Sequence, residues 1–399
     1  MTVRPPGTRL WVVHALVASY AVCWMAQVPV LPYLVKELGA ESNMAYAALQ
    51  TWFNLAQLLG GLLAGSLVDK YGGRTLLIIS FAASALSYAM TALARSVPML
   101  FLSRLPTMFQ HAMLAARTLL MTECSFEDRA LHLSFVGAAY GIGFAVGPAL
   151  GGSLSKHSLQ LSAWAATIGS LLCAAAVIIW LPVSKVQEQQ ATRAKTVGWF
   201  ESFKVLRNPA VRHLLIVKML TSFPSTILQT VVLLLLAQEF GLDVSGNGLV
   251  LSFAGVVIMA SQALLVEPLQ RRVGEGRAMI CGCVLLALAN LGVGLSRSLP
   301  QFMTAMTLSC AGGVVVATIN SVQMTQHVET HAIGSLMALD MSLGSALRLV
   351  TPTIGTTLLK LAGRRGIGFV GAACYCLLLI GFQTRVLSQP PTAHKLKDI

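Results

Sequence analysis

The sequence is short of charged residues. Asp, Glu, Lys and Arg make up only 11% of its 399 residues, whereas soluble domains average about 25%. Its mean hydropathy is +0.72, and 55% of its residues are hydrophobic. A chain with so little charge cannot cover the surface of a soluble domain, so this composition excludes a soluble globular protein and predicts a membrane protein.

The sequence also lacks patterns for catalysis, metal binding or cofactor binding. It contains no phosphate loop, no zinc-ligand spacing and no nucleophile elbow. Its eight cysteines are scattered, and the pairs Cys281/Cys283 and Cys374/Cys376 would point about 200° apart on a helix. We therefore predict that the protein is not an enzyme and holds no metal and no cofactor.

Long apolar runs are what the sequence has in abundance. Twelve runs reach the length of about 20 residues that a helix needs to cross a bilayer, and they are centred near residues 20, 56, 85, 110, 142, 170, 226, 257, 286, 311, 345 and 376. They do not alternate as the strands of a barrel would. In lipid, each segment must satisfy its own backbone amides. The sequence therefore predicts an all-α membrane protein with twelve transmembrane helices in two pseudo-symmetric six-helix bundles.

The net charge of +13 is spread through short loops rather than gathered in one basic patch. If the N-terminus is cytoplasmic and twelve helices follow, 18 Lys and Arg residues lie on the cytoplasmic side and 7 on the other. That is the positive-inside bias of membrane proteins. We expect both termini in the cytoplasm, a plasma or organelle membrane, and no nucleic-acid partner. The first apolar run is too long for a signal-peptide core and predicts the first helix.

The two halves of the sequence echo each other. "GPALGGSL" at 147–154 aligns with "TPTIGTTL" at 351–358, an offset of 204 residues, and "DKYG" at 69–72 aligns with "RRVG" at 271–274, an offset of 202. Transporters built from two related bundles show such repeats. We expect an N-terminal bundle over 1–181, a cytoplasmic linker over 182–212 and a C-terminal bundle over 213–399.

Several motifs carry a family resemblance. "GSLVDKYGGR" (65–74) resembles the loop signature of the major facilitator superfamily, and "RLPTMFQHAMLAA" (104–116) resembles its helix 4 motif around an intramembrane arginine. "GFAVGPALGG" (143–152) resembles the helix 5 signature of its drug/proton antiporters. "QTWFNLAQLLGG" (50–61) and "LIVKMLTSFP" (215–224) look like the organic-cation-transporter-like branch of solute carrier family 22, itself similar to bacterial tetracycline antiporters.

The resemblance implies a secondary transporter that works by alternating access. We expect it to move small organic solutes, drug-like molecules or organic cations, in exchange for protons, as a monomer in a lipid bilayer. The charges within the predicted spans are Arg104, Lys218 and Arg348 against Asp340, a sum of +2, which disfavours a cation. Organic anions or zwitterions therefore remain an alternative, as does a receptor or scaffold with the same fold.

Two motifs predict a gate. Asp69 ends the second helix, where a carboxylate favours the N-terminus of a neighbouring helix; the resemblance implies helix 11 of the other half. Three glycines of the helix 5 motif recur every four residues, a stripe that allows close backbone approach. We expect that stripe to pack against a helix of the other half. The gating residues are Gly65, Asp69, Gly72, Arg74, Gly143, Gly147, Pro148, Gly151 and Gly152.

Titratable groups at membrane depth predict the proton-coupling residues. Arg104 and His111 are seven residues apart in the fourth predicted helix and would share one face. Asp340 lies eight residues, about 12 Å along a helix, from Arg348. Asp340 and His111 are our candidates for proton coupling. The alternatives are a hydrogen-bonded structural histidine and a structural ion pair of Asp340 with Arg348 or with a charge on another helix.

Polar side chains inside apolar runs predict the substrate cavity, because such groups in a span normally face a cavity or a partner. The candidates are Gln27, Asn54, Gln57, Arg104, Lys218, Gln229 and Arg348. In the resembled family, helices 1, 2, 4, 5, 7, 8, 10 and 11 line the cavity.

Overall fold

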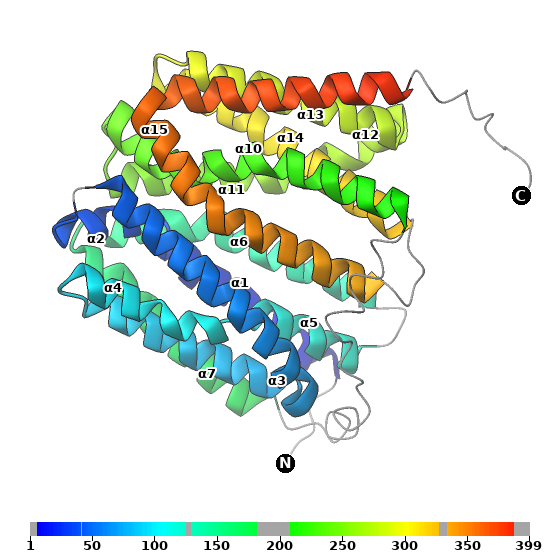
Figure 1. Cartoon of the computed structure of the whole chain (residues 1–399). Helices are drawn as coiled ribbons and strands as arrows, with labels where there is room; N and C mark the ends of the chain where they lie inside the picture. Colours follow the sequence, from blue (N-terminus) through cyan, green and yellow to red (C-terminus); the bar gives the residue numbers. More distant parts are fainter. Residues whose placement is uncertain (1–5, 41, 125–128, 182–207, 327–332, 387–399) are drawn as a thin grey trace, which may run out of the picture.

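The computed structural model of the chain describes residues 6–40, 42–124, 129–181, 208–326 and 333–386 (Figure 1). Within these ranges it contains helices and no strands. The helices are α1 (Pro6–Gln27), α2 (Leu31–Glu37), α3 (Asn43–Ala92), α4 (Val97–Ser103), the 3₁₀ helix η1 (Leu105–Phe109), α5 (Ala112–Glu123), α6 (Arg129–Leu154), α7 (Leu159–Trp180), α10 (Pro209–Phe240), α11 (Val244–Leu264), α12 (Val266–Val273), α13 (Glu275–Leu295), α14 (Leu299–Gln326) and α15 (Ile333–Val386).

Ten stretches of described helix are long and apolar enough to cross a bilayer. One of them, Ser342–Gly381, is 40 residues long and holds two crossings, because Gly363 adopts a φ of 58° between them. Gly72, with a φ of 77°, separates two crossings in α3 in the same way, and these two are already counted among the ten stretches. Residues 97–123 form a further crossing that is not one continuous helix. The predicted all-α fold with twelve crossings is confirmed.

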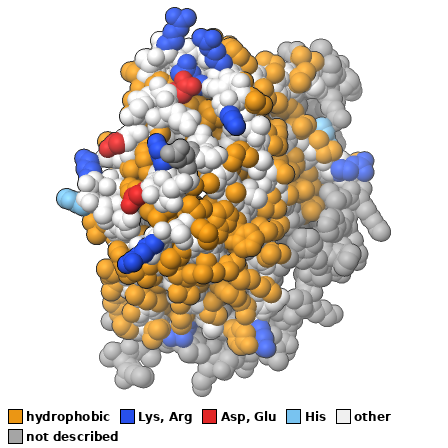
Figure 2. All heavy atoms as spheres, turned by 60° about the vertical axis from the view of Figure 1, so that its left-hand side comes forward, with side chains coloured by type: hydrophobic (Ala, Val, Ile, Leu, Met, Phe, Trp, Pro, Cys, Tyr) orange, Lys and Arg blue, Asp and Glu red, His pale blue; other side chains and the backbone are white. Residues whose placement is uncertain are grey.

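Large apolar side chains cover the outer faces of these helices. Leu172, Leu264 and Leu361 are each at least 65% exposed. Figure 2 shows the apolar side chains as a broad area with scattered charged groups. Soluble monomers rarely expose contiguous apolar patches of more than a few hundred Å². A bilayer instead favours such a surface, which is the physical reason that this chain needs so little charge.

The fourth crossing is broken at its centre, so the prediction of one helix face carrying Arg104 and His111 was wrong. α4 ends at Ser103, a 3₁₀ turn follows, and α5 begins at Ala112. Pro106 supplies a physical reason, because it has no backbone N–H to continue an α-helix. His111 is the residue that precedes α5 and has a φ of −119°.

Neighbouring side chains bind the backbone groups that this break releases. Ser87 Oγ donates to the Ser103 carbonyl at 2.7 Å, and Gln57 Nε2 donates to the Thr107 carbonyl at 2.7 Å. Irregular backbone at membrane depth is tolerated where protein groups satisfy it in this way.

The crossings form two halves, called here the first half (α1–α7) and the second half (α10–α15). They meet along two main contacts, α6 with α11 and α3 with α15, and Figure 1 shows the first half below the second. If the twelve crossings are numbered in chain order, the fifth contacts the eighth and the second contacts the eleventh. The two contacts are equivalent, because crossing five of the first half corresponds to crossing eleven of the second, and crossing two corresponds to crossing eight. Most of the predicted linker, 182–207, lies outside the described residues, and α10 begins at Pro209.

Candidate substrate cavities and gating seam

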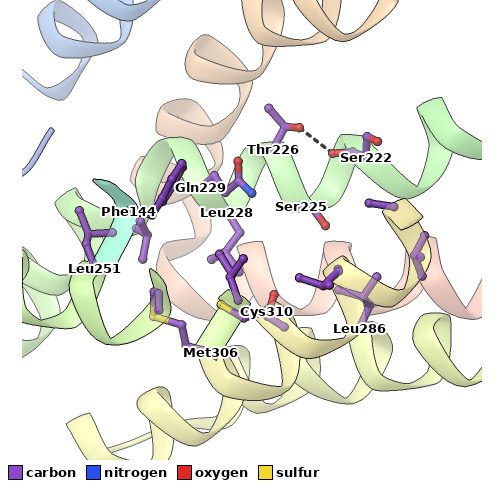
Figure 3. A pocket seen from close by; sticks show the side chains of 18 of the residues that line it. Phe144, Ser222, Ser225, Thr226, Leu228, Gln229, Leu251, Leu286, Met306 and Cys310 are labelled. Carbon is purple, nitrogen blue, oxygen red and sulfur yellow. Dashed lines mark hydrogen bonds between the residues drawn. The ribbon is translucent and has the colours of Figure 1, made fainter. Parts of the chain in front are cut away.

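Two cavities adjoin where the halves meet. The larger, here the apolar cavity, has a volume of about 570 Å³. The smaller, here the polar cavity, has a volume of about 270 Å³. Val28, Thr226 and Gln229 line both. The apolar cavity is shown in Figure 3 and is lined in part by Phe144, Ser222, Leu228, Leu251, Met306 and Cys310.

The polar cavity collects charged, amide and aromatic side chains from both halves. Its lining includes Trp24, Gln27, Tyr46, Gln50, Phe53, Asn54, Tyr88, Arg104, Gln110, Gln229 and Arg348. Five of these were predicted from the sequence, and Lys218, the sixth, lines the apolar cavity. Gln57 lines neither cavity and instead holds the broken fourth crossing, so the expectation for this residue is not met. Gln50 and Gln110 were missed, although each is an amide inside an apolar run.

Arg104 is buried, with 6% of its surface exposed. Its Nη2 donates to Thr91 Oγ1 at 2.8 Å, and its Nε has no partner among the described residues. The structure pairs it with no carboxylate of the described chain. An unpaired buried charge is costly in a membrane and commonly marks a functional position; the role of Arg104 in the substrate cavity stays a prediction.

Arg348 ties the two halves together through its backbone. Its carbonyl accepts a hydrogen bond from Asn54 Nδ2 at 3.0 Å, and the neighbouring Leu349 carbonyl accepts one from Thr51 Oγ1 at 3.1 Å. The Arg348 guanidinium contacts Ser345 Oγ at 3.3 Å on its own helix. The side chain lines the polar cavity and forms no close ion pair within the described chain, although the charge of Asp340 acts on it from a longer distance.

Asp340 pairs with Lys218. Lys218 Nζ lies 2.6 Å from Asp340 Oδ2, and the two side chains are 23% and 21% exposed. Of the alternatives left by the sequence, the structure therefore selects a partner on another helix, α10, in place of Arg348. Lys218 lines the apolar cavity, so the pair connects Asp340 to that cavity.

His111 lies apart from both cavities. Its backbone N–H donates to Ser80 Oγ at 3.1 Å, and Gly61 lies beside its ring. The buried Nε2 has no partner among the described residues. Its role in proton coupling stays a prediction.

The described side chains of the loop motif at 65–74 make their contacts within the first half. Arg74 donates to the Leu181 carbonyl through Nε and to the Ile178 carbonyl at 3.4 Å, at the end of α7. A cation at a helix C-terminus is favourable. A Cβ added at Gly65 would have no neighbour within 4 Å, so no other backbone approaches closely at this residue of the predicted gating motif. The Asp69 side chain lies outside the described residues, and its latch stays a prediction.

The glycine stripe of α6 faces α1, so the prediction that it faces the other half was wrong. An added Cβ would lie 2.2 Å from Ala21 Cβ at Gly143, 2.6 Å from Met25 Cβ at Gly147 and 2.0 Å from the Ala26 carbonyl oxygen at Gly151. The stripe therefore packs two helices of the first half at backbone contact distance. Its sequence spacing shows that a neighbour approaches but carries no information about which helix it is.

The seam between the halves uses the other side of α6, together with α11. At Gly152 an added Cβ would lie 2.9 Å from Ser245 Cα. On α11, it would lie 2.3 Å from the Pro148 carbonyl oxygen at Gly248 and 2.5 Å from the Phe144 carbonyl oxygen at Gly255. Gly248 and Gly255 were missed, although their spacing of seven residues was a signal that they share a helix face.

Replacing Gly248 with Ala is expected to separate α6 from α11. The new methyl carbon would lie 2.3 Å from the Pro148 carbonyl oxygen, which is closer than van der Waals contact allows. Overpacking typically costs about 1–3 kcal/mol, so we expect the equilibrium between the state in which this seam is closed and the state in which it is open to shift toward the open state by about fivefold or more. Distances between spin labels on α2 and α11 would measure it. Gly276→Ala, with no neighbour within 4 Å, is the matched control; equal distances in both variants would contradict a gating seam.

Comparison with known proteins identifies the class. The model of the Major Facilitator Superfamily matches residues 13–352 and, again, 214–398. The chain belongs to this superfamily, and it is a multi-pass membrane transporter of small solutes rather than an enzyme.

Individual relatives span nearly the whole chain. Solute carrier family 22 member 18 of Rattus norvegicus is 28% identical over 390 residues, which cover 94% of this chain and 93% of the relative. The class B tetracycline resistance protein of Escherichia coli is 23% identical over 374 residues, 92% of this chain and 93% of the relative. The resemblance inferred from the motifs is confirmed.

Solved structures share the fold. The human organic anion transporter MFSD10 (TETRAN) superposes with a TM-score of 0.71 at 20% identity, and the superposition covers 95% of this chain and 100% of that one. The nucleoside transporter NupG superposes with a TM-score of 0.74 at 14% identity, covering 95% of this chain and 99% of that one.

Proposed function

We propose that the protein is a proton-coupled secondary active transporter of small organic solutes. The observation that carries this proposal is the Lys218–Asp340 pair at 2.6 Å. Its carboxylate can take up and release a proton, and its ammonium group lines the apolar cavity. Protonation of Asp340 would leave Lys218 without its counter-charge, so the charge facing the cavity would change with the proton.

The contacts between the halves support alternating access. Tyr33 Oη donates to the Leu242 carbonyl at 2.6 Å and accepts from Asn247 Nδ2 at 2.9 Å, and Gln238 Nε2 donates to Asn43 Oδ1 at 3.1 Å. These bonds lie at the ends of the helices where α2 and α11 meet. The halves are thus joined on that side, and opening there requires this set of bonds to break.

The charge of the solute decides the sense of the coupling. A cationic solute competes with the proton for Asp340, which gives exchange, the sense expected from the antiporter resemblance. An acidic solute is attracted when protonation leaves Lys218 positive, which gives transport together with the proton. In both cases the proton gradient supplies the driving force, because solute and proton change each other's affinity reciprocally.

The test is uptake into sealed proteoliposomes of the purified chain. A pH gradient of either sign is imposed, and acidic, neutral and basic solutes are offered in parallel. We expect at least one class to accumulate above equilibrium in a gradient-dependent manner. Transport that continues unchanged after an ionophore has collapsed the gradient would make the protein a uniporter instead.

A further inference from the structure

The polar cavity concentrates positive charge. Arg104 and Arg348 both line it, and the lining that the structure describes includes no Asp or Glu. Its other polar members are neutral amides and hydroxyl groups. Because a cleft lined by one sign of charge attracts ligands of the opposite sign, this cavity favours an acidic group and disfavours an ammonium group.

Two other cations of the second half have a carboxylate partner, although Arg364, like Arg104, has an Nε without a partner among the described residues. Lys218 pairs with Asp340 at 2.6 Å, and Arg364 Nη1 lies 3.5 Å from Glu239 Oε2. Arg104 has a hydroxyl partner and, at Nε, no partner among the described residues. This arginine is therefore buried at a cavity wall with donor capacity that no described group uses.

The rest of the cavity completes a site for a solute with an aromatic or apolar body. Trp24 and Phe53 form a T-shaped pair with ring centroids 5.3 Å apart, and both line the polar cavity. Gln229 lies at the junction with the apolar cavity, where Figure 3 shows it beside Leu228. One molecule can therefore place a polar end at the arginines and an apolar end in the larger cavity.

We propose that the polar cavity binds the acidic group of the transported solute, a carboxylate or sulfonate, through Arg104 and Arg348. The apolar body of the solute then lies in the apolar cavity. Guanidinium groups suit this role because their planar fork matches a carboxylate. Taken together, the two adjoining volumes, about 270 and 570 Å³, fall within the range of roughly 300–1,000 Å³ that is usual for small-molecule sites. The inference rests on the proposed transport function and names its substrate class: small amphiphilic organic acids.

The test is equilibrium binding to the purified full chain in nanodiscs of neutral phosphatidylcholine, which keeps acidic lipid headgroups out of the competition. Three probes share one ring system and differ in charge: 2-naphthoate, 2-naphthamide and 2-naphthylmethylammonium. Isothermal titration calorimetry measures each affinity. We expect 2-naphthoate to bind at least tenfold more tightly than the other two.

Variants then assign the site. Arg104→Gln and Arg348→Gln should each weaken 2-naphthoate binding at least tenfold and leave 2-naphthamide binding within threefold. Arg364→Gln, whose side chain pairs with Glu239 and lines neither cavity, is the matched control and should bind like the parent chain. The melting temperature of each variant is measured as a control for folding. Arg104→Gln removes a buried charge that has no carboxylate partner in the described chain, so we expect it not to lower the melting temperature.

Three results would overturn the proposal: no measurable 2-naphthoate binding, an ammonium probe that binds as tightly as the acid, or acid binding unchanged in both arginine variants. The measurement uses no gradient, so it separates this inference from proton coupling. Acid binding without gradient-driven uptake would count against the coupling alone, whereas gradient-driven uptake of only the ammonium probe would count against the site alone.

Discussion

Replacing Asp340 with Asn is expected to abolish accumulation driven by a pH gradient while exchange of solute for solute continues. Asn keeps the shape of the side chain and can still accept a hydrogen bond from Lys218, now 2.6 Å from the carboxylate, but it cannot take up or release the proton. For an acidic solute, which does not compete for Asp340, we expect gradient-driven accumulation to fall at least tenfold and exchange to stay within about threefold of the parent chain. Proteoliposome uptake with and without an imposed gradient measures both quantities.

Glu239→Gln is the matched control for this variant. Glu239 also pairs with a cation in the second half, Arg364 at 3.5 Å, but it lines neither cavity, so its removal should leave the coupling intact. His111→Gln, the second candidate, is expected to shift the pH optimum. Parental pH dependence in the Asp340→Asn and His111→Gln double variant would contradict both assignments and direct the search to Asp69 and Glu123, whose side chains lie outside the described residues.

Replacing Gly151 with Ala is expected to destabilise the first half. The new methyl carbon would lie 2.0 Å from the Ala26 carbonyl oxygen, a backbone atom that cannot rotate away, so α1 and α6 must separate. Such overpacking costs about 1–3 kcal/mol. This cost exceeds the gain of about 0.5–1 kcal/mol that Ala usually brings over Gly inside a helix. Thermal unfolding of the purified variant in one detergent measures the loss as a lowered melting temperature.

Gly137→Ala is its control on the same helix. Gly137 is exposed, and an added Cβ there has no neighbour within 4 Å, so only the helix propensity changes. We expect this variant to be as stable as the parent chain or slightly more stable. If both variants unfolded at the same temperature, the close packing of α6 on α1 would not contribute to stability.

Periodicity in the sequence predicted the elements of the fold but not their breaks. The fourth apolar run predicted one helix, yet the chain leaves the α conformation between Ser103 and Ala112. Pro106 was visible in the sequence. The compensating bonds from Ser87 and Gln57 were not, because they depend on how the two crossings of α3 pack against the break.

The candidate site was predicted in its residue types and only partly in its partners. Arg104, Arg348 and Gln229 could be found because a charge or amide inside an apolar run stands out. The pairing of Asp340 with Lys218 could not, since the two are 122 residues apart in the sequence. The apolar sequence around them showed only that each needed a neighbour.

The sequence by itself determined that this protein is a helical membrane transporter of two related halves, because hydropathy and local motifs depend on neighbouring residues alone. Tertiary structure decided which surfaces meet: the glycine stripe of α6 on α1, Gly248 and Gly255 on the seam, and Lys218 on Asp340. The physical reason is that a helix satisfies its own backbone in lipid. The spacing of residues along the sequence then fixes which side chains share a face of the helix. Only the packing of all the helices fixes what that face contacts.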